Sequence, residues 1–229
     1  MKIPSTKNTS SKYGVISLRG MAALMVVLST IGCGDTVTQK PFVFDMTRLN
    51  QDGSVNDGKD FAKQPWACVK DNQSGLVWEV KVTEPGMRNI NNTYSWYDPD
   101  KNTNGGFPGK DNGGACADSN CDTDSYIKAV NAKKLCGLTD WYLPSRFELN
   151  TIVDTSIPPP GPTLPKAFFP ETAAGKYWTD TTFRTRRAAA WVWRFDQGSD
   201  YVVEKSEALN VRLTHATQQK KVDAKAPQK

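Results

Sequence analysis

The sequence predicts a single α+β domain with two short helices, antiparallel strands and long loops. Two stretches of short apolar runs and turn signals, 66–81 and 177–213, predict strands, and two helical patterns lie between them. Residues 82–122 are mostly Gly, Asn, Asp, Lys and Thr, which predicts a long loop before the first helix. Because strands and helices occur in separate runs, the order is that of an α+β domain.

The strands are predicted from turn signals and from alternating side chains. Residues 66–81 contain the polar turn DNQSG between two short apolar runs, which predicts a β-hairpin. Trp78 and Val80 fall on one face and Glu79 and Lys81 on the other, so the second strand is expected to be half-buried. An earlier strand is expected in PFVFDM, and four later antiparallel strands with one aromatic face are expected in YWTDT, AAWVWRF, DYVVEK and NVRLT.

The two helices are predicted from apolar spacing and capping residues. Residues 123–136 carry apolar side chains three and four positions apart, with Thr123 or Asp124 as the cap and Gly137 as the stop. Ser145 and Glu148 form a capping-box pattern at the start of a second short amphipathic helix within 145–154. Six prolines follow within 156–170, which predicts a connecting loop.

The charge distribution excludes several classes of function. The chain has 229 residues and a formal net charge of +5, but the two ends, 1–32 and 216–229, supply more than all of that positive charge. The part between them is slightly acidic, so a nucleic-acid-binding face is not expected. His215 is the single histidine of the sequence. Since no nucleophile and base are paired by spacing, we expect no enzymatic activity.

The N-terminus has the pattern of an export signal. A basic stretch is followed by the apolar core MAALMVVLSTIG and then by Cys33. The ending STIGC resembles a bacterial lipobox, although Thr30 stands where leucine is preferred. By that resemblance Cys33 would carry the lipid, and Gly34 after it would favour the outer membrane. We therefore expect residues 1–32 to be a lipoprotein signal peptide.

Four cysteines remain after Cys33, an even number that suggests disulfides in an oxidising compartment. Three pairings are possible, and we favour Cys68 with Cys136 and Cys116 with Cys121. A zinc site would need paired short spacings such as Cys-x-x-Cys, and the sequence contains none.

Several segments together resemble the Lcl C-terminal domain family, over about residues 60–214. They are CVKDNQSGLVWEVK, TYSWYDPD, YIKAVNAKKLCGLTDWYLPSRFELNTIVD, KYWTDT and AAAWVWRFDQG. The resemblance implies a C-type-lectin-like fold, in the same superfamily as formylglycine-generating enzymes. No cysteine follows Cys136, so it implies no such enzyme activity here. The Glu-Pro-Asn motif of lectins that bind sugars through calcium is absent from the sequence, so the resemblance does not imply calcium-dependent sugar binding.

Three groups of residues are candidates for binding. Arg184, Arg186 and Arg187 could hold an acidic glycan, because guanidinium groups bind carboxylates and sulfates. Trp96, inside the long loop, is the tryptophan expected to be exposed enough to stack on a sugar. A possible calcium loop is indicated by alternating oxygen ligands, although it lacks the usual glycine and glutamate; its residues are Asp98, Asp100, Asn102 and Asn104.

The resulting hypothesis is a lipid-anchored binding or adhesion module of the bacterial envelope, with acidic glycans or envelope proteins as partners and without nucleic acid or a required cofactor. The alternative is a non-catalytic structural subunit of an envelope assembly. The sequence does not indicate an oligomeric state. The expected organisation is a signal peptide, a lipidated Cys33 with tether and lead-in, a folded domain, and a disordered polar tail, at 1–32, 33–59, 60–215 and 216–229.

Overall fold

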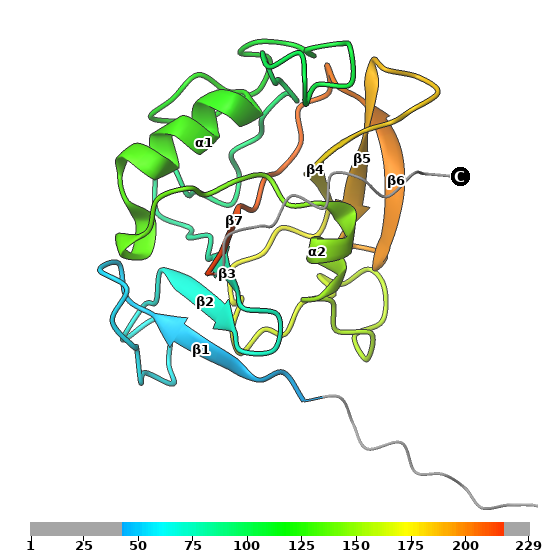
Figure 1. The fold of residues 1–229 in the computed structure, drawn as a ribbon. Coiled ribbons are helices and arrows are strands. Elements are labelled where there is room, and N and C mark those ends of the chain that lie inside the picture. Colours follow the sequence, from blue (N-terminus) through cyan, green and yellow to red (C-terminus); the bar gives the residue numbers. More distant parts are fainter. Residues whose placement is uncertain (1–42, 218–229) are drawn as a thin grey trace, which may run out of the picture. The chain divides into compact units, whose positions relative to one another are not determined.

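A computed structural model describes residues 43–217, so the predicted signal peptide, the predicted lipidation site Cys33 and most of the predicted tail lie outside the described residues. The described part contains two antiparallel sheets and short helices, which confirms the α+β prediction (Figure 1). No described helix is long and apolar enough to cross a membrane.

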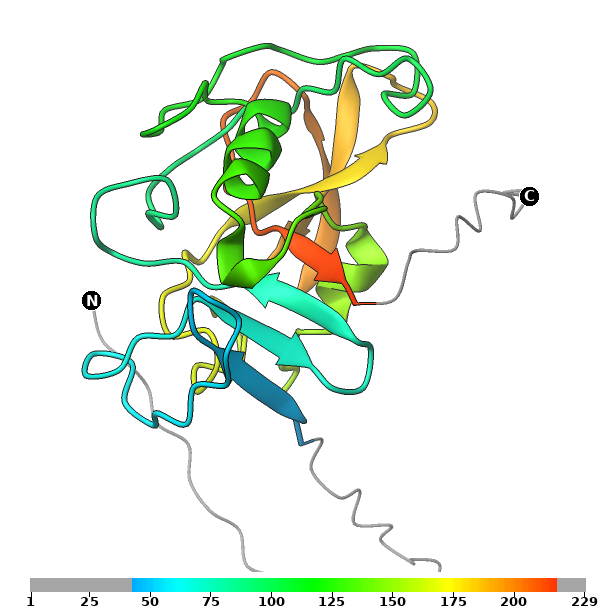
Figure 2. The ribbon, with the colours of Figure 1, turned by 60° about the vertical axis from the view of Figure 1, so that its left-hand side comes forward.

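The first sheet has four strands in the order β1–β2–β3–β7. The β2–β3 hairpin forms across the predicted DNQSG turn, with Val69 opposite Trp78. β7 pairs with the other edge of β3, with His215 opposite Val77, so the last strand of the described chain lies beside the hairpin near its start (Figure 2). The strand bounds are Met46–Leu49 for β1, Cys68–Asp71 for β2, Leu76–Glu79 for β3 and Thr214–Ala216 for β7.

Three expectations for this sheet are wrong. All of β3 is buried rather than half-buried, because other parts of the chain cover both of its faces; Glu79 is 0 % exposed and Lys81 is 3 % exposed. The expected strand 210–214 begins only at Thr214, and of the residues expected before it Asn210 alone forms an isolated bridge, with Tyr177. The first strand also lies later than expected, since β1 shares only Met46 with PFVFDM.

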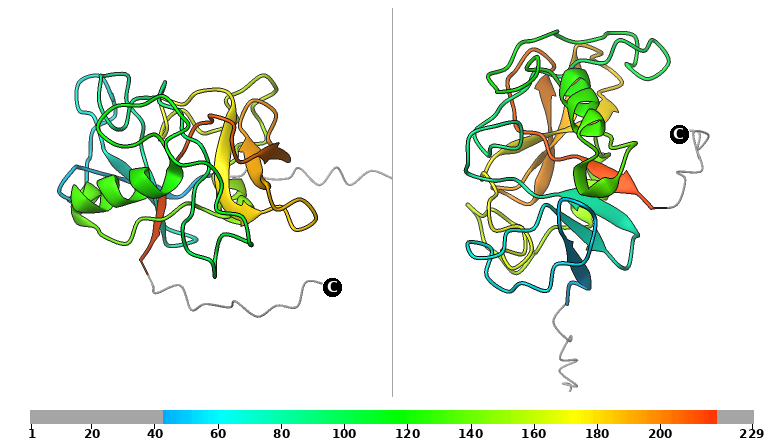
Figure 3. Two further views of the ribbon diagram at one scale, coloured as in Figure 1. Left: turned by 90° about the horizontal axis from the view of Figure 1, so that it is seen from above. Right: turned by 90° about the vertical axis from the view of Figure 1, so that its left-hand side faces the viewer.

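The second sheet has the order β4–β5–β6, with bounds Lys176–Thr182, Ala189–Arg194 and Ser199–Glu204. It confirms three of the later strands. Successive side chains of β5 point to opposite faces. Val192 therefore enters one core cluster, whereas Trp193 enters the other. In the right panel of Figure 3, β1 and β2 lie at one end of the described part, and the long loop before α1 runs from the end of β3 to the other end.

The first helix, α1, spans Thr123–Ala132 and is followed by the 3₁₀ turn η1 at Leu135–Gly137. Its cap is Asp122, one residue before the expected position, and the Asp122 carboxylate accepts a hydrogen bond from the N–H of Ser125 at 2.8 Å. The helix ends before the expected residue 136. Lys134 and Cys136 have positive φ angles, which α-helical backbone does not adopt.

The second helix, α2, spans Arg146–Asn150 and has the predicted capping box. The Ser145 hydroxyl accepts from the N–H of Glu148 at 3.2 Å, and the Glu148 carboxylate accepts from the N–H of Ser145 at 2.7 Å. Both backbone N–H groups, which have no partner within the helix, are thereby hydrogen-bonded. The helix ends sooner than the predicted 154, and Leu149 anchors it in the core.

The two favoured disulfides are both present. Cys68 on β2 bonds to Cys136 on η1, with Cα atoms 6.4 Å apart, and fixes the segment after α1 to the first sheet. Cys116 bonds to Cys121, with Cα atoms 5.5 Å apart, and closes a small loop immediately before the Asp122 cap. The long loop is therefore held at the point where it enters the helix.

Candidate functional site

A cleft of about 840 Å³ lies where the long loop, α1, the segment before α2 and the end of β4 meet. Pockets of this size are typical of sites for small ligands. Figure 1 shows the loop before α1 and the β4–β5 hairpin on the same side of the domain. The lining residues are Trp96, Tyr97, Asp98, Thr103, Thr123, Asp124, Ile127, Tyr142, Leu143, Asp180, Thr181 and Thr182.

Hydrogen bonds between distant segments hold the walls of the cleft. The N–H of Tyr97 donates to the Thr123 hydroxyl at 2.9 Å, and that hydroxyl donates to the Tyr97 carbonyl at 2.8 Å, which joins the loop to α1. The Thr182 hydroxyl donates to the Asn104 carbonyl at 3.0 Å, which joins β4 to the same loop. Loop residues held by a rigid scaffold are a common setting for binding sites.

Trp96 forms part of the floor of the cleft and is not the exposed platform that was expected. It is 2 % exposed, and its indole N–H donates to the Thr179 carbonyl at 2.8 Å. The Lys205 ammonium lies 3.7 Å from the centre of the Trp96 ring and donates to two backbone carbonyls, and burial lowers the pKa of Lys205 to about 8. Of the seven tryptophans, Trp191 is the one that is not fully buried.

The side wall formed by Tyr142 is fixed by α2. The Tyr142 hydroxyl donates to the Glu148 carboxylate at 2.8 Å, the same side chain that completes the capping box. Burial, assisted by this hydrogen bond, raises the pKa of Tyr142 above its usual value. Tyr142 therefore remains a neutral aromatic wall at physiological pH.

Three carboxylates from three different segments line the cleft. Asp98 comes from the long loop, Asp124 from the first turn of α1 and Asp180 from β4. Asp124 is paired with Lys128 at 2.6 Å, and Lys128 is 70 % exposed, so the pair is weak. The lining residues, all within the described chain, include no lysine, arginine or histidine. The cleft is therefore acidic.

The three predicted arginines lie in the connection between β4 and β5 and do not line the cleft. All three are exposed. Arg186 pairs with Glu204 at 3.0 Å, and Arg187 donates to the Gly105 carbonyl at 3.1 Å. Arg184 lies on the same exposed connection. These contacts attach the connection to β6 and to the long loop, beside the cleft wall at Thr182.

The residues of the possible calcium loop lie in one tight turn. Asp98 accepts from the N–H of Asp100, and Asp100 accepts from the N–H of Asn102, both at 2.9 Å. Asn104 is 3 % exposed, and its side-chain oxygen accepts from the N–H of Gly106 at 2.8 Å. Within residues 43–217, no group of three or more His, Cys, Asp or Glu side chains could hold a metal ion. Calcium binding stays a prediction.

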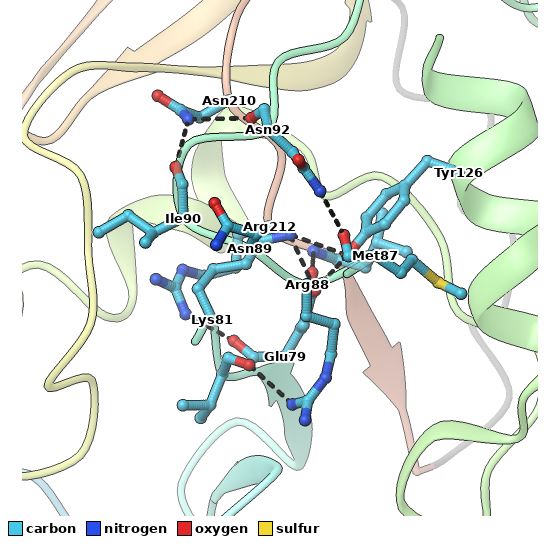
Figure 4. Close-up of polar contacts among 12 residues, drawn as sticks. Glu79, Lys81, Met87, Arg88, Asn89, Ile90, Asn92, Tyr126, Asn210 and Arg212 are labelled. Carbon is cyan, nitrogen blue, oxygen red and sulfur yellow. Dashed lines mark hydrogen bonds and ion pairs between the residues drawn. The ribbon is translucent and has the colours of Figure 1, made fainter. Parts of the chain in front are cut away.

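A buried cluster of charges, missed by the sequence analysis, lies between β3, α1 and the segment before β7 (Figure 4). Glu79 forms an ion pair with Lys81 at 2.8 Å. The Lys81 ammonium donates to the Tyr126 hydroxyl, which in turn donates to the Glu79 carboxylate. The second Glu79 oxygen accepts from the N–H of Leu213 at 3.0 Å. Arg212, 0 % exposed, donates to the Glu79 carbonyl and to the Thr172 hydroxyl.

This cluster holds more cations than carboxylates. Burial lowers the pKa of Lys81 to about 8 against the opposing attraction of Glu79, and burial raises the pKa of Tyr126 well above its usual value. Arg88 lies nearby and donates to the Ala67 and Val80 carbonyls. Because Glu79 and Lys81 are buried among these partners, the cluster is structural in character and offers no surface for a ligand.

Comparison with known proteins gives one family. The model of the Lcl C-terminal domain matches residues 67–215. No curated protein and no solved structure matches this chain.

Proposed function

This chain belongs to the Lcl C-terminal domain family, which indicates a domain associated with the bacterial envelope, and we propose that it is an exported, lipid-anchored, non-catalytic binding module whose ligand site is the cleft. The observation that carries this proposal is the 840 Å³ cleft, lined by aromatic rings, hydroxyls and carboxylates. These are the groups with which proteins hold polar ligands such as glycans.

The position of the cleft supports binding rather than a purely structural role. Its walls come from the long loop at 96–103, from the capped start of α1, from the segment before α2 and from β4. These elements are held by the hydrogen bonds of Thr123 and Thr182. A site assembled in this way requires little rearrangement on binding, which lowers the entropic cost of holding a ligand.

The lipid anchor at Cys33, with location at the outer membrane, remains part of the proposal and has its own test. The full chain and its Cys33→Ala variant are expressed in a Gram-negative host, and the fractions are separated. The proposal expects the full chain in the outer-membrane fraction with the mass of a lipidated N-terminus, because several acyl chains anchor firmly. The variant should lose the lipid mass. An unlipidated full chain would contradict it.

Acidic glycans remain the proposed ligands of the arginine connection beside the cleft. Arg184, Arg186 and Arg187 could contact an anionic part of a glycan that extends past Thr182. The pairing of Arg186 with Glu204 reduces the positive charge available there.

The binding test is a glycan array with the full chain in detergent, with intact disulfides, in the presence of calcium and of a chelator. Thr182→Trp, which fills the cleft, should abolish binding at the cleft, whereas Arg184→Ala should weaken only acidic glycans. Loss of binding with chelator would support the loop of Asp98, Asp100, Asn102 and Asn104 as a calcium site. Absence of binding to any glycan would contradict the proposal.

One observation favours the alternative of a structural subunit in an envelope assembly. Phe147 on α2 is 71 % exposed, and the Arg146 guanidinium lies between it and Trp191, at 4.8 and 4.3 Å from the two ring centres. Aromatic residues beside arginine are enriched at the centres of protein interfaces. If this surface is an interface, Phe147→Asp should release the chain from a defined complex in solubilised membranes, whereas Thr182→Trp should not.

A further inference from the structure

We propose that the free edge of β6 pairs with the β6 edge of a second copy of this chain, so that two three-stranded sheets join across a two-fold axis. The inference goes beyond the proposed function, because no residue of β6 lines the cleft. Three features of the edge support it, namely its unpaired backbone groups, its cancelled charges and the exposed ring at its centre.

β6 differs from the other strands that end a sheet. The two sheets end at β1, β7, β4 and β6, and β6 forms the right-hand margin of its sheet in Figure 1. Further segments are hydrogen-bonded to the outer sides of the first three. These backbone bonds run from Asn56 to Arg48 on β1, from Tyr142 to Thr214 on β7 and from Asn210 to Lys176 on β4, at 2.9, 2.9 and 3.1 Å.

The hydrogen-bond pattern of the β5–β6 pair identifies the free groups of β6. The N–H of Lys205, just after β6, donates to the Ala188 carbonyl at 2.8 Å, so the backbone groups of Lys205 point toward β5. Since these groups alternate along an antiparallel strand, those of Asp200 and Val202 point outward. Within residues 43–217, no segment is hydrogen-bonded to them. They can therefore pair with the backbone of an added strand.

The edge also lacks the features that normally block such pairing, which are prolines, bulges and unpaired charges. β6 contains no proline and pairs with β5 over six successive residues without a register shift. Its two carboxylates are both paired, Asp200 with Arg146 at 2.7 Å and Glu204 with Arg186 at 3.0 Å. The charges of β6 are therefore cancelled within one copy, and two copies can approach without like-charge repulsion.

The side chains of β6 complement themselves in one antiparallel register. With Tyr201 at the two-fold axis, it faces its own counterpart, and Asp200 faces Val202 of the second copy, so the outward backbone groups meet. Tyr201 is 54 % exposed, and such a non-hydrogen-bonded pair of rings stabilises antiparallel strands. On the other face, the exposed Phe147 lies beside the same edge, because the Arg146 guanidinium contacts both its ring and Asp200. This self-complementarity favours a second copy over an unrelated strand.

The first test measures the oligomeric state of the full chain in detergent by sedimentation velocity at several protein concentrations. We expect a reversible dimer that Val202→Pro weakens by at least about tenfold, since proline removes an outward N–H and leaves the bonds to β5 intact. Val202→Lys keeps the N–H but adds a charge at the edge, and it should also weaken the dimer. Urea unfolding midpoints check that both variants fold. A chain that is monomeric at every concentration, or a dimer that neither variant weakens, would overturn the proposal.

The second test is cysteine cross-linking, which reports the register. Tyr201→Cys places two thiols at a non-hydrogen-bonded pair, where Cα atoms lie about 4.5 Å apart, within reach of a disulfide. Mild oxidation should link two copies of Tyr201→Cys, whereas Ser199→Cys, two residues away on the same face, should give little linkage. The parent chain controls for linkage through Cys33. Equal linkage in the two variants would contradict the register.

Matched arginine variants test the role of the cancelled charges. Arg146→Ala leaves Asp200 without its partner near the same residue of the second copy, and it should weaken the dimer by about tenfold, and by less at high salt. Arg48→Ala is the control, because Arg48 also stacks between two rings, Trp66 and Phe168, at 4.7 and 4.8 Å, but lies on β1. Equal weakening by both variants would overturn the charge argument.

The outcomes separate this inference from the proposed function. Thr182→Trp should leave the dimer unchanged, and Val202→Pro should leave glycan binding unchanged. A dimer lost in Thr182→Trp and kept in Val202→Pro would overturn the β6 edge as the interface. A chain that binds no glycan but loses its dimer in Val202→Pro would support this inference and contradict the proposed function.

Discussion

The buried cluster around Glu79 and the cleft lined by Asp98 and Asp180 both contain carboxylates and hydroxyl groups, but they differ in burial and in the cations that accompany them. In the cluster, cations, a hydroxyl and an N–H group meet one carboxylate that is 0 % exposed. In the cleft, hydroxyls donate away from the open space and the lining includes no cation among the described residues. The carboxylate of the cluster is enclosed by the fold, whereas the carboxylates of the cleft lining are partly exposed.

The largest effect is expected from breaking the buried pair. Lys81→Met leaves Glu79 buried without its ammonium partner, which should lower the free energy of unfolding by about 3–5 kcal/mol. Urea unfolding followed by tryptophan fluorescence measures it. Lys128→Met is the matched control, because it breaks the exposed pair with Asp124 and should cost less than about 1 kcal/mol. Equal losses of unfolding free energy in Lys81→Met and Lys128→Met would contradict the expected difference between the buried and the exposed ion pair.

The two disulfides are also expected to differ in their effects on stability and on ligand binding. Replacing Cys68 and Cys136 by serine opens a closure with a sequence separation of 68 residues and should cost about 4 kcal/mol. Replacing Cys116 and Cys121, separated by 5 residues, should cost about 2 kcal/mol but should also weaken ligand binding, because that loop leads directly into the Asp122 cap of α1, whose first turn lines the cleft. Urea unfolding and calorimetry measure these two losses. A reversed order of the stability losses would contradict the closure argument.

The pH dependence of the free energy of unfolding should reflect the lowered pKa of the buried Lys81. Burial lowers the pKa of Lys81 to about 8 from 10.5, so between these values the unfolded chain holds a proton that the folded chain has released. Stability should therefore rise with pH over this window, by at most about 1.4 kcal/mol per pH unit for this group. Lys205 contributes with the same sign. Urea midpoints at successive pH values should rise less steeply in Lys81→Met than in the parent chain.

The smallest effect on stability is expected at the cleft. Asp180→Asn should change the free energy of unfolding by less than about 0.5 kcal/mol, since the residue is only partly buried and asparagine keeps its shape. Thermal unfolding measures this effect. A large loss of stability would show that Asp180 belongs to the structural group of carboxylates.

Local signals in the sequence were sufficient for several elements. The capping box of Ser145 and Glu148, the turn of the β2–β3 hairpin and the two disulfides were all predicted. Each depends on residues close in sequence or on the small number of ways in which four cysteines can pair. By contrast, the burial of Glu79 depends on α1 and on the segment before β7, whose Tyr126 and Leu213 contact the side chain that the alternation pattern assigned to solvent.

The cleft could be predicted only in part. Asp98 and Trp96 were singled out as candidates, but Trp96 is buried because the loop folds onto the Thr179 carbonyl of β4, far along the chain. Thr123, Tyr142 and Asp180 are ordinary residues in their own segments and acquire a common role only when three segments meet. No pattern in one segment marks such a site. The acidic character of the cleft was likewise hidden, because the sequence drew attention to the arginines beside it.

The buried cluster also constrains how this chain can diverge. Loss of Glu79 alone would leave two buried cations without a carboxylate, and loss of Lys81 alone would leave the carboxylate without its ammonium. Each single step is therefore costly, while a joint replacement by apolar residues of similar volume can be neutral. Positions 79, 81 and 212 should consequently be inherited as a linked set, so that related sequences keep all three charges or exchange them together.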